Sequence, residues 1–309
     1  MARYARLTTC SWGPGRDEGD QIESNLRQAC EMIDRAALDG PDIICLSELF
    51  AHRNLETHEA LDRAQPVPGP ITHAIGEVAR RHRCYVTANL YEELGGRVHN
   101  SSALIGRDGD VVGVYRKVHP TPGEVEGGIT PGTETPVFDT DFGRVGMAIC
   151  WDLHFLDVLE GMIEQDVQLV LWPSMYQGGF QLRMWAYLAG AYVVSAWPGN
   201  ICEIMDMNAY PLAATNYGYP IASADVNFDR QVFLRCTARE KWEAIRERYG
   251  TGIELELMHA QGTFTIASKM EDVTVEQIAE QFGLDRRRDY YAFCLCQRQE
   301  ALSGTEGVD

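Results

Sequence analysis

Two kinds of apolar pattern alternate along this chain of 309 residues. Short apolar runs between turn residues are typical of buried strands, whereas apolar residues three and four positions apart are typical of helices. We expect strands at residues 6–9, 43–46, 85–88, 100–105, 111–115, 145–149, 167–172 and 192–196, with weaker patterns at 221–225 and 231–233. We expect helices at residues 22–37, 71–82, 153–165, 182–189, 239–249 and 273–282. This alternation predicts an α/β fold with helices on both sheet faces.

Turn residues refine this architecture. Asp20 followed by Glu23 resembles a capping box at the start of the first helix, and Gly40-Pro41 ends that helix. The dipeptide at residues 108–109 is Asp-Gly and lies between two strand-like runs, which predicts a hairpin. Hairpins mixed with β-α units favour a mixed sheet or a four-layer sandwich over a simple doubly wound sheet.

The charge of the chain narrows its possible partners. It carries 27 Lys and Arg residues against 45 Asp and Glu residues, which gives a net charge of -18. Such a surface repels phosphate backbones and acidic lipids, so we expect no nucleic-acid partner. No apolar run approaches the ~20 residues of a membrane-spanning helix, so we expect no membrane partner. The first residues also lack the apolar core of a secretory signal.

Nine cysteines are scattered through the chain. Their odd number and irregular spacing do not form a disulfide framework, and several lie in apolar runs. Reduced thiols of this kind are typical of a cytoplasmic protein, so we expect a cytoplasmic location. The chain has no C-x-x-C pair, and Cys294 and Cys296 stand alone near its end, so we expect no metal site.

Three polar residues, Glu48, Lys117 and Cys150, each follow one of the expected strands. Ligands and catalytic groups gather at the carboxyl ends of strands in open α/β sheets, so a carboxylate, an ammonium and a thiol at such ends indicate a functional site. Taken singly, each residue also has a plain structural interpretation. A cysteine after an apolar run is most often a buried thiol, and the other two fit a helix start and a solvated loop.

Together the three side chains fit covalent catalysis by a thiolate. A thiol is mostly protonated at neutral pH, so Cys150 needs a base to take its proton or a cation to hold the thiolate. Glu48 can act as that base. Lys117 can stabilise the thiolate and then the oxyanion of a tetrahedral intermediate, and the backbone N–H of Trp151 can donate a second hydrogen bond.

The sequence around these residues resembles the nitrilase, or carbon–nitrogen hydrolase, superfamily. The nucleophile motif of that family is similar to Gly-Arg-Val-Gly-Met-Ala-Ile-Cys-Trp-Asp at residues 143–152. Its glutamate motif resembles Pro-Asp-Ile-Ile-Cys-Leu-Ser-Glu-Leu-Phe at residues 41–50, and its lysine motif resembles Tyr-Arg-Lys-Val-His at residues 115–119. Leu-Trp-Pro-Ser at residues 171–174 matches the strand end after the nucleophile helix. The resemblance covers about residues 4–235.

This resemblance implies an α-β-β-α sandwich with a Glu48–Lys117–Cys150 triad. Glu48 would be the general base, Lys117 the oxyanion stabiliser, and Cys150 the nucleophile that forms a thioester acyl-enzyme. The family also implies a second glutamate in the loop after the lysine, for which Glu124 is the better match and Glu126 the competitor. That glutamate would position the substrate or Lys117 and assist proton transfer.

The resemblance implies further properties of the chain. The carbon–nitrogen hydrolase domain would span residues 1–270, and residues 271–309 would form a C-terminal helix and a tail that is either disordered or at an oligomer interface. We also expect the last ten or so residues to be disordered. The family implies no metal and no organic cofactor. It implies a homodimer or a larger homo-oligomer, with interface segments at residues 153–165, 181–189 and 286–293.

The substrate is predicted only as a class of small molecule. The Asp-Leu-x-Phe pattern at residues 152–155 favours amide hydrolysis, whereas Trp151 slightly favours nitriles. We expect oxyanion or substrate contacts from Trp151, Trp172, Ser174, Met175 and Tyr176, although aromatic residues are also common in cores and interfaces. The sequence therefore predicts an amidase for a small amide. The alternatives are a nitrilase or an N-carbamoyl amide hydrolase with the same triad, or a catalytically silent interaction protein on the same fold.

Overall fold

The computed structural model describes residues 3–258 and 260–303, which divide into two compact units. The larger unit is Ala5–Val226, and the smaller unit combines the N-terminal segment with the residues that follow Val226. Each unit has an apolar core of its own. The expected domain boundary after residue 270 stays a prediction, because compactness does not test which residues a hydrolase domain needs.

The first sheet of the larger unit has the strand order β12-β1-β2-β3-β4-β5. β1, β2 and β3 run parallel, whereas β4 pairs antiparallel with both β3 and β5. The strands are β1 (Tyr4–Cys10), β2 (Ile43–Cys45), β3 (Tyr85–Leu94), β4 (Arg97–Ile105), β5 (Val111–Arg116) and β12 (Ile221–Asn227). The short strand β2 is wholly buried, as its continuous apolar sequence predicts for a strand covered on both faces.

The second sheet has the strand order β11-β10-β9-β8-β7-β6. Its central strands β7, β8 and β9 are parallel, and the strands outside them are antiparallel. The strands are β6 (Val137–Asp139), β7 (Arg144–Met147), β8 (Leu169–Pro173), β9 (Tyr192–Ala196), β10 (Glu203–Met205) and β11 (Pro211–Ala214). Each of the three central strands was expected from its apolar run, but β6, β10 and β11 were not.

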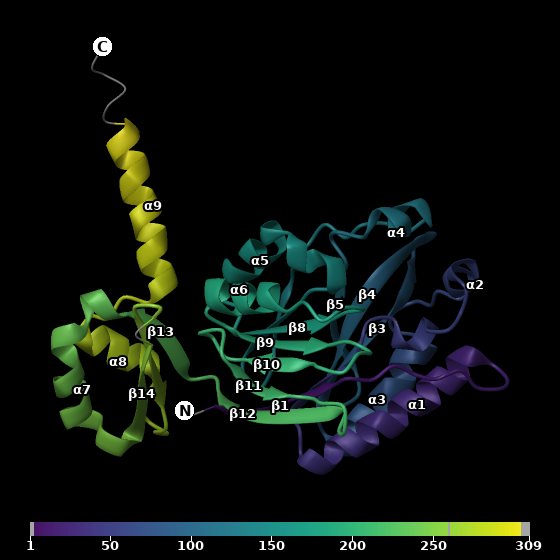
Figure 1. Cartoon of the computed structure of the whole chain (residues 1–309), viewed down its shortest axis with the longest axis horizontal. Helices are drawn as coiled ribbons and strands as arrows, with labels where there is room; N and C mark the ends of the chain where they lie inside the picture. The colour runs from purple at the N-terminus through teal and green to yellow at the C-terminus, as the bar shows by residue number, and fades with distance from the viewer. Residues whose placement is uncertain (1–2, 259, 304–309) are drawn as a thin grey trace. The chain divides into compact units, whose positions relative to one another are not determined.

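Helices α1 (Gln21–Ala36) and α3 (Pro70–His82) cover the outer face of the first sheet, as Figure 1 shows. Their apolar stripes contribute Ile33 and Ile75 to a core that also contains Ile44 of β2. Burial of these faces stabilises the layer, because apolar surface is removed from water on both sides of the contact.

Helices α5 (Leu156–Ile163) and α6 (Phe180–Ala189) cover the second sheet. The packing against α5 is so close that a Cβ on Gly146 of β7 would lie 2.8 Å from the sulfur of Met162. The inner faces of the sheets meet where β2 and β3 contact β8. The larger unit is therefore the predicted four-layer α-β-β-α sandwich.

Short helical segments connect these layers. They are η1 (Ala37–Asp39), η2 (Phe50–His52), α2 (Thr57–Asp62), α4 (Pro122–Glu126) and η3 (Cys150–His154). The helix expected at residues 153–165 is divided into η3 and α5, with Phe155 extended between them. At the start of η3, the side chain of Asp152 accepts the backbone N–H of Ile149 and closes a tight turn.

The smaller unit is built on an antiparallel sheet with the order β13-β15-β14. Its elements are β13 (Arg230–Leu234), η4 (Arg235–Thr237), η5 (Arg239–Lys241), α7 (Trp242–Tyr249), η6 (Gly250–Gly252), β14 (Ile253–Met258), β15 (Thr263–Ser268), α8 (Val275–Phe282) and α9 (Arg287–Ser303). Ile245 of α7 and Ile278 of α8 pack with Phe233 and Phe264 of the sheet. The helices at 239–249 and 273–282 were expected, but β14, β15 and α9 were not.

Helix α9 corrects one expectation about the end of the chain. Residues 300–303 belong to this helix, so the prediction of disorder is wrong for them, and residues 304–309 lie outside the described residues. Arg287 is the buried residue of α9. Among the described residues, no helix combines the length and apolarity needed to cross a membrane. The expected cytoplasmic location, the oligomeric state and the interface segments stay predictions.

The start of α1 gives a test of the fold. Asp20 caps this helix by accepting the N–H groups of Ile22 and Glu23, and its other oxygen pairs with Arg63. We expect Asp20→Ala to lower the free energy of unfolding by about 1 kcal/mol, because it leaves these amides without their acceptor. Asp20→Asn keeps the cap and removes the charge, so urea unfolding should give a smaller loss for it. If Asp20→Ala and Asp20→Asn lose the same free energy of unfolding, the effect comes from the ion pair with Arg63 and not from the cap.

Candidate active site

The structure brings Glu48, Lys117 and Glu124 into direct contact in the larger unit. Lys117 Nζ lies 3.0 Å from Glu48 Oε1 and 2.9 and 2.8 Å from the two carboxylate oxygens of Glu124. Glu48 follows β2 and Lys117 follows β5, as expected. Both side chains are only 2% exposed, so water screens their interaction little.

The backbone of Lys117 is fixed on both sides. Its N–H donates to the carbonyl of Asn100, and its carbonyl accepts the N–H of Gly132, each at 2.8 Å. A Cβ at residue 132 would lie 2.2 Å from the carbonyl oxygen of Arg116, so this close approach requires glycine. The Thr-Pro-Gly segment at residues 130–132 therefore holds the lysine in place.

Glu124 has two structural tasks. It lies on the short helix α4, where its Oε2 accepts the N–H of Thr121 at 2.7 Å in a capping box. The same carboxylate binds Lys117. Glu126, the alternative from the sequence, is exposed at the end of α4. Of the two glutamates, Glu124 is the one that contacts Lys117.

Asn100 completes this cluster and was not expected from the sequence. Its Nδ2 donates to Glu48 Oε1 at 2.8 Å and to Glu124 Oε1 at 3.0 Å, so it bridges the two carboxylates. The side chain is fully buried on β4. The available signal was a run of polar residues, Asn-Ser-Ser at residues 100–102, at the start of the strand expected at residues 100–105.

The charges in the cluster support one another. Burial alone lowers the pKa of Lys117, but the carboxylates of Glu48 and Glu124 outweigh it and raise that pKa above its usual value. Burial raises the pKa of Glu124, but Lys117 outweighs it, and the net pKa is lowered. Lys117 and Glu124 are therefore both charged at neutral pH.

Cys150 lies at a sharp turn after β7, as the first residue of η3. Its φ of 45° is in the left-handed region, which is uncommon for a residue other than glycine. Its carbonyl accepts a hydrogen bond from Trp172 Nε1 at 3.1 Å and one from the Tyr176 hydroxyl at 3.5 Å. The surrounding side chains thus hold the backbone in a conformation that it would not favour alone.

Asp152 fixes the same turn from inside. Its carboxylate accepts the Tyr115 hydroxyl at 2.7 Å and the N–H groups of Ile149 and His119, each at 2.8 Å. The side chain is fully buried, and burial raises the pKa of Asp152 while these hydrogen bonds oppose the rise. Through these contacts Asp152 orients the turn that carries Cys150.

The thiol of Cys150 interacts electrostatically with the cluster. Burial and the negative charge of Glu48 raise its pKa to about 12, while Lys117, the backbone of Met175 and the side chain of Ser174 lower it. The thiol is therefore protonated at neutral pH, and it needs a base before it can attack.

The other residues with predicted substrate or oxyanion contacts divide into two groups. Trp172 and Ser174 are fully buried, and each interacts with Cys150. Trp151 and Met175 are exposed, and Tyr176 is half-buried. Roles for all five in substrate or oxyanion binding stay predictions.

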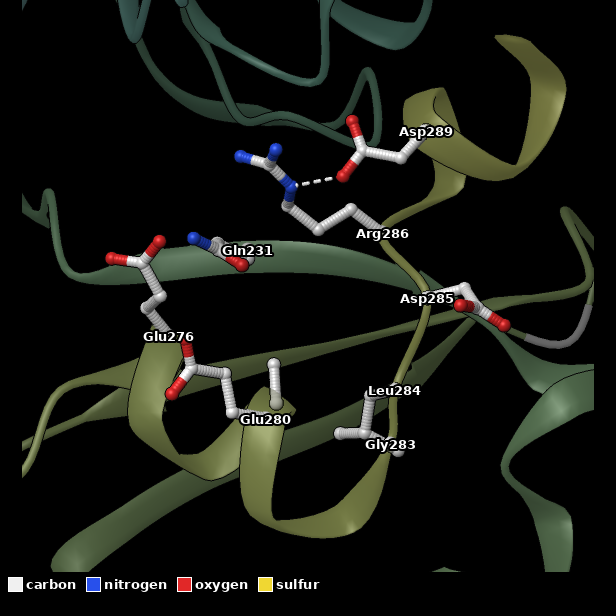
Figure 2. A pocket seen from close by; sticks show the side chains of 9 residues that line it. Gln231, Glu276, Glu280, Gly283, Leu284, Asp285, Arg286 and Asp289 are labelled. Carbon is white, nitrogen blue, oxygen red and sulfur yellow. Dashed lines mark hydrogen bonds and ion pairs between the residues drawn. The ribbon is translucent and has the colours of Figure 1, made fainter. Parts of the chain in front are cut away.

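One pocket, with a volume of about 310 Å³, lies in the smaller unit and contains none of these residues. Carboxylates of Glu276, Glu280 and Asp289 line it, and Arg286 binds Asp289 at its rim (Figure 2). In the described part of the chain, no three His, Cys, Asp or Glu side chains are grouped as metal ligands would be.

A family model described as Carbon-nitrogen hydrolase matches residues 19–210, which include the whole cluster around Cys150. The chain belongs to the carbon–nitrogen hydrolase family. This membership confirms the resemblance, and it confirms the prediction of an amidase-like carbon–nitrogen hydrolase at the level of the family.

Curated relatives include omega-amidases. This hydrolase is 30% identical over 192 residues to omega-amidase NIT2 of Mus musculus, a match that covers 57% of the chain and 69% of that protein. It is 31% identical over 161 residues to omega-amidase NIT2 of Homo sapiens, a match that covers 49% of the chain and 58% of that protein. The chain thus spans little more than half the length of the human relative.

Solved structures with the same fold include Saccharomyces cerevisiae Nit3, a member of branch 10 of the nitrilase superfamily. It superposes with a TM-score of 0.65 at 17% identity and covers 80% of this hydrolase and 95% of the yeast chain. A mutant of the amidase from Nesterenkonia sp. AN1 gives a TM-score of 0.64 at 18% identity, with 72% and 93% of the two chains covered. At these identities the likeness shows the fold.

The turn at Asp152 makes a prediction about stability. Asp152→Asn places an amide N–H₂ among three donors, so we expect the free energy of unfolding to fall by about 1–3 kcal/mol in urea. Tyr115→Phe removes one of the three bonds and should cost about 1 kcal/mol. Asp157 is an exposed partner of His119, so Asp157→Asn is the control. It should change the free energy of unfolding by less than about 0.5 kcal/mol. A loss for Asp157→Asn equal to that for Asp152→Asn would contradict this account.

The thiol environment makes a prediction about pH. Alkylation of Cys150 by iodoacetamide requires the thiolate, so its rate should rise with pH toward a midpoint near the pKa of about 12. Glu48→Gln removes a negative charge that raises this pKa, so the midpoint should move to lower pH. Mass spectrometry of the modified peptide measures both profiles. An unchanged or higher midpoint in Glu48→Gln would mean that Glu48 does not act on the thiol.

Proposed function

We propose that this chain is an amidase that hydrolyses a small amide through a thioester on Cys150. The observation that carries the proposal is the buried Glu48–Lys117–Glu124 cluster, whose charges act on the Cys150 thiol. A thiol, a carboxylate base and a fixed cation are the groups that acyl transfer needs. The amide specificity is supported by the omega-amidases to which the chain is similar.

Glu48 is the proposed general base. Its Oε1 accepts hydrogen bonds from Lys117 and Asn100, whereas its Oε2 is buried and has no partner among the described residues. The bound oxygen fixes the orientation of the carboxylate, and the other oxygen stays available for a proton. The high pKa of the thiol is the reason that a base is needed.

The first half of the proposed reaction forms the acyl-enzyme. Glu48 takes the thiol proton as the sulfur of Cys150 bonds to the amide carbon, and the carbonyl oxygen becomes an oxyanion. The ammonium of Lys117 and the backbone N–H of Trp151 stabilise that oxyanion. The carbon–nitrogen bond then breaks as Glu48 gives its proton to the nitrogen, which releases ammonia and leaves a thioester.

The second half regenerates the thiol. Glu48 takes a proton from water as the oxygen of that water bonds to the thioester carbon. The carbon–sulfur bond breaks, the sulfur regains a proton from Glu48, and the carboxylic acid leaves. Glu124 keeps Lys117 charged and in place through both halves, which is a positioning role.

Activity tests this proposal directly. Wild-type protein and Cys150→Ala should be incubated with a panel of primary amides, N-carbamoyl compounds and nitriles, with ammonia release as the readout. We expect release from amides by the wild type and none by Cys150→Ala, because the thiol is the nucleophile. Cys45→Ala is the matched control. Cys45 is fully buried, and burial raises the pKa of its thiol to about 12, as for Cys150. No glutamate or lysine contributes to the pKa shift of Cys45.

Other results would change the assignment. Full activity in Cys150→Ala would sink the proposal. Ammonia release from nitriles or N-carbamoyl compounds alone would favour a different specificity with the same three residues. Intact mass should show an acyl adduct in the wild type that is missing from Cys150→Ala, and its absence together with no turnover would favour an interaction protein.

A further inference from the structure

We propose that Arg53 binds a carboxylate of the substrate, so that this hydrolase prefers small amides that carry a negative charge. The inference rests on the proposed function, because it concerns the substrate of the same site. Arg53 follows Glu48 by five residues, directly after η2. Its guanidinium Nη1 lies 3.5 Å from the sulfur of Met175.

Met175 connects Arg53 to the reacting thiol. The backbone of Met175 hydrogen-bonds to Cys150, while its side chain is exposed and contacts Arg53. One residue therefore touches the thiol through its backbone and the guanidinium through its side chain. Met175 thus lies between the thiol and the guanidinium, so a short substrate can have its amide at Cys150 and a charged group at Arg53.

The position of Arg53 is fixed by its surroundings. Its backbone carbonyl accepts a hydrogen bond from the fully buried Asn25 at 2.8 Å. Its side-chain stem packs against Gly13, where an added Cβ would lie 3.0 Å from Nε and 2.7 Å from Cβ of Pro198. A guanidinium held in this way loses little freedom on binding a carboxylate, which favours affinity.

The guanidinium of Arg53 has no acidic partner. Among the described residues, no carboxylate lies within ion-pair distance of it, and the side chain is half-buried. Two other arginines of this unit are paired: Arg63 with Asp20 at 2.6 Å and Arg116 with Glu92 at 2.7 Å. In a chain of net charge -18, a fixed arginine without an acid is available for an anion from outside.

The charge of the site explains why such a cation matters. The buried cluster has two carboxyl groups and one ammonium, and Lys117 is already bound to both glutamates. An anionic substrate would be repelled there unless a second cation compensates its charge. Arg–carboxylate pairs are bidentate and charge-assisted, and they give both affinity and orientation.

A matched pair of substrates tests the inference. Succinamate carries a carboxylate where butyramide carries a methyl group. We expect the wild type to prefer succinamate in kcat/KM, and Arg53→Gln to lower kcat/KM for succinamate by about 10- to 100-fold, mainly through KM. The kcat/KM of Arg53→Gln for butyramide should differ from that of the wild type by less than about twofold, because butyramide makes no charge-assisted bond. Arg53→Lys should recover part of the loss, since it restores the charge.

Controls separate recognition from folding and from the proposed reaction. Arg27→Gln, on the exposed face of α1, should leave both substrates unchanged, and thermal unfolding of Arg53→Gln should match the wild type. Binding is measured independently by calorimetry of succinamate with Cys150→Ala and with Cys150→Ala/Arg53→Gln. We expect the second protein to bind succinamate about 10- to 100-fold more weakly.

The outcomes discriminate between the two proposals. Equal turnover of the two amides by the wild type, or equal losses for both in Arg53→Gln, would overturn the role of Arg53 and leave the amidase intact. If neither amide is turned over, the amidase proposal fails for these substrates. The calorimetry then decides about Arg53, because equal binding by the two Cys150→Ala proteins would overturn the inference.

Discussion

The contact between Lys117 and two carboxylates, the buried Glu48 and the partly buried Glu124, is the interaction on which the site depends. Charged groups are costly to remove from water, and they are stable in a protein interior only when each has partners. Here Lys117 binds Glu48 and Glu124, and Asn100 bridges the same two carboxylates. Four segments of the chain must meet for this to happen, so the sandwich and the cluster specify each other.

The position of the thiol depends on a second set of contacts. Cys150 has a positive φ, and such a conformation persists only when surrounding groups enforce it. Trp172 and Tyr176 hold its carbonyl, while Asp152 binds the turn through three hydrogen bonds. Of the aromatic residues expected to touch the substrate, Trp172 and Tyr176 therefore hold the backbone of Cys150, whereas Trp151 is exposed.

Much of this could be predicted from the sequence, and the rest has physical reasons for being missed. The strands before Glu48, Lys117 and Cys150 are visible as apolar runs, and β2 has no polar alternation because it is covered on both faces. Asn100 was missed because its role depends on the pairing of β4 with β3 and on a contact with Glu124, which the sequence does not encode locally. β14 was missed because it alternates Glu with Leu, and the charged residues obscure its strand pattern. α9 was missed because its side chains are almost all exposed, so its sequence has no apolar stripe.

The double role of Glu124 has a consequence for the loop that carries it. A helix of five residues has too few hydrogen bonds to be stable alone, so α4 depends on its cap and its neighbours. Because one carboxylate both caps α4 and neutralises Lys117, folding of the loop and ionisation of the lysine are thermodynamically linked. Opening the loop would leave a buried ammonium with one acid fewer. We therefore expect the loop after β5 to open less readily while Lys117 is charged.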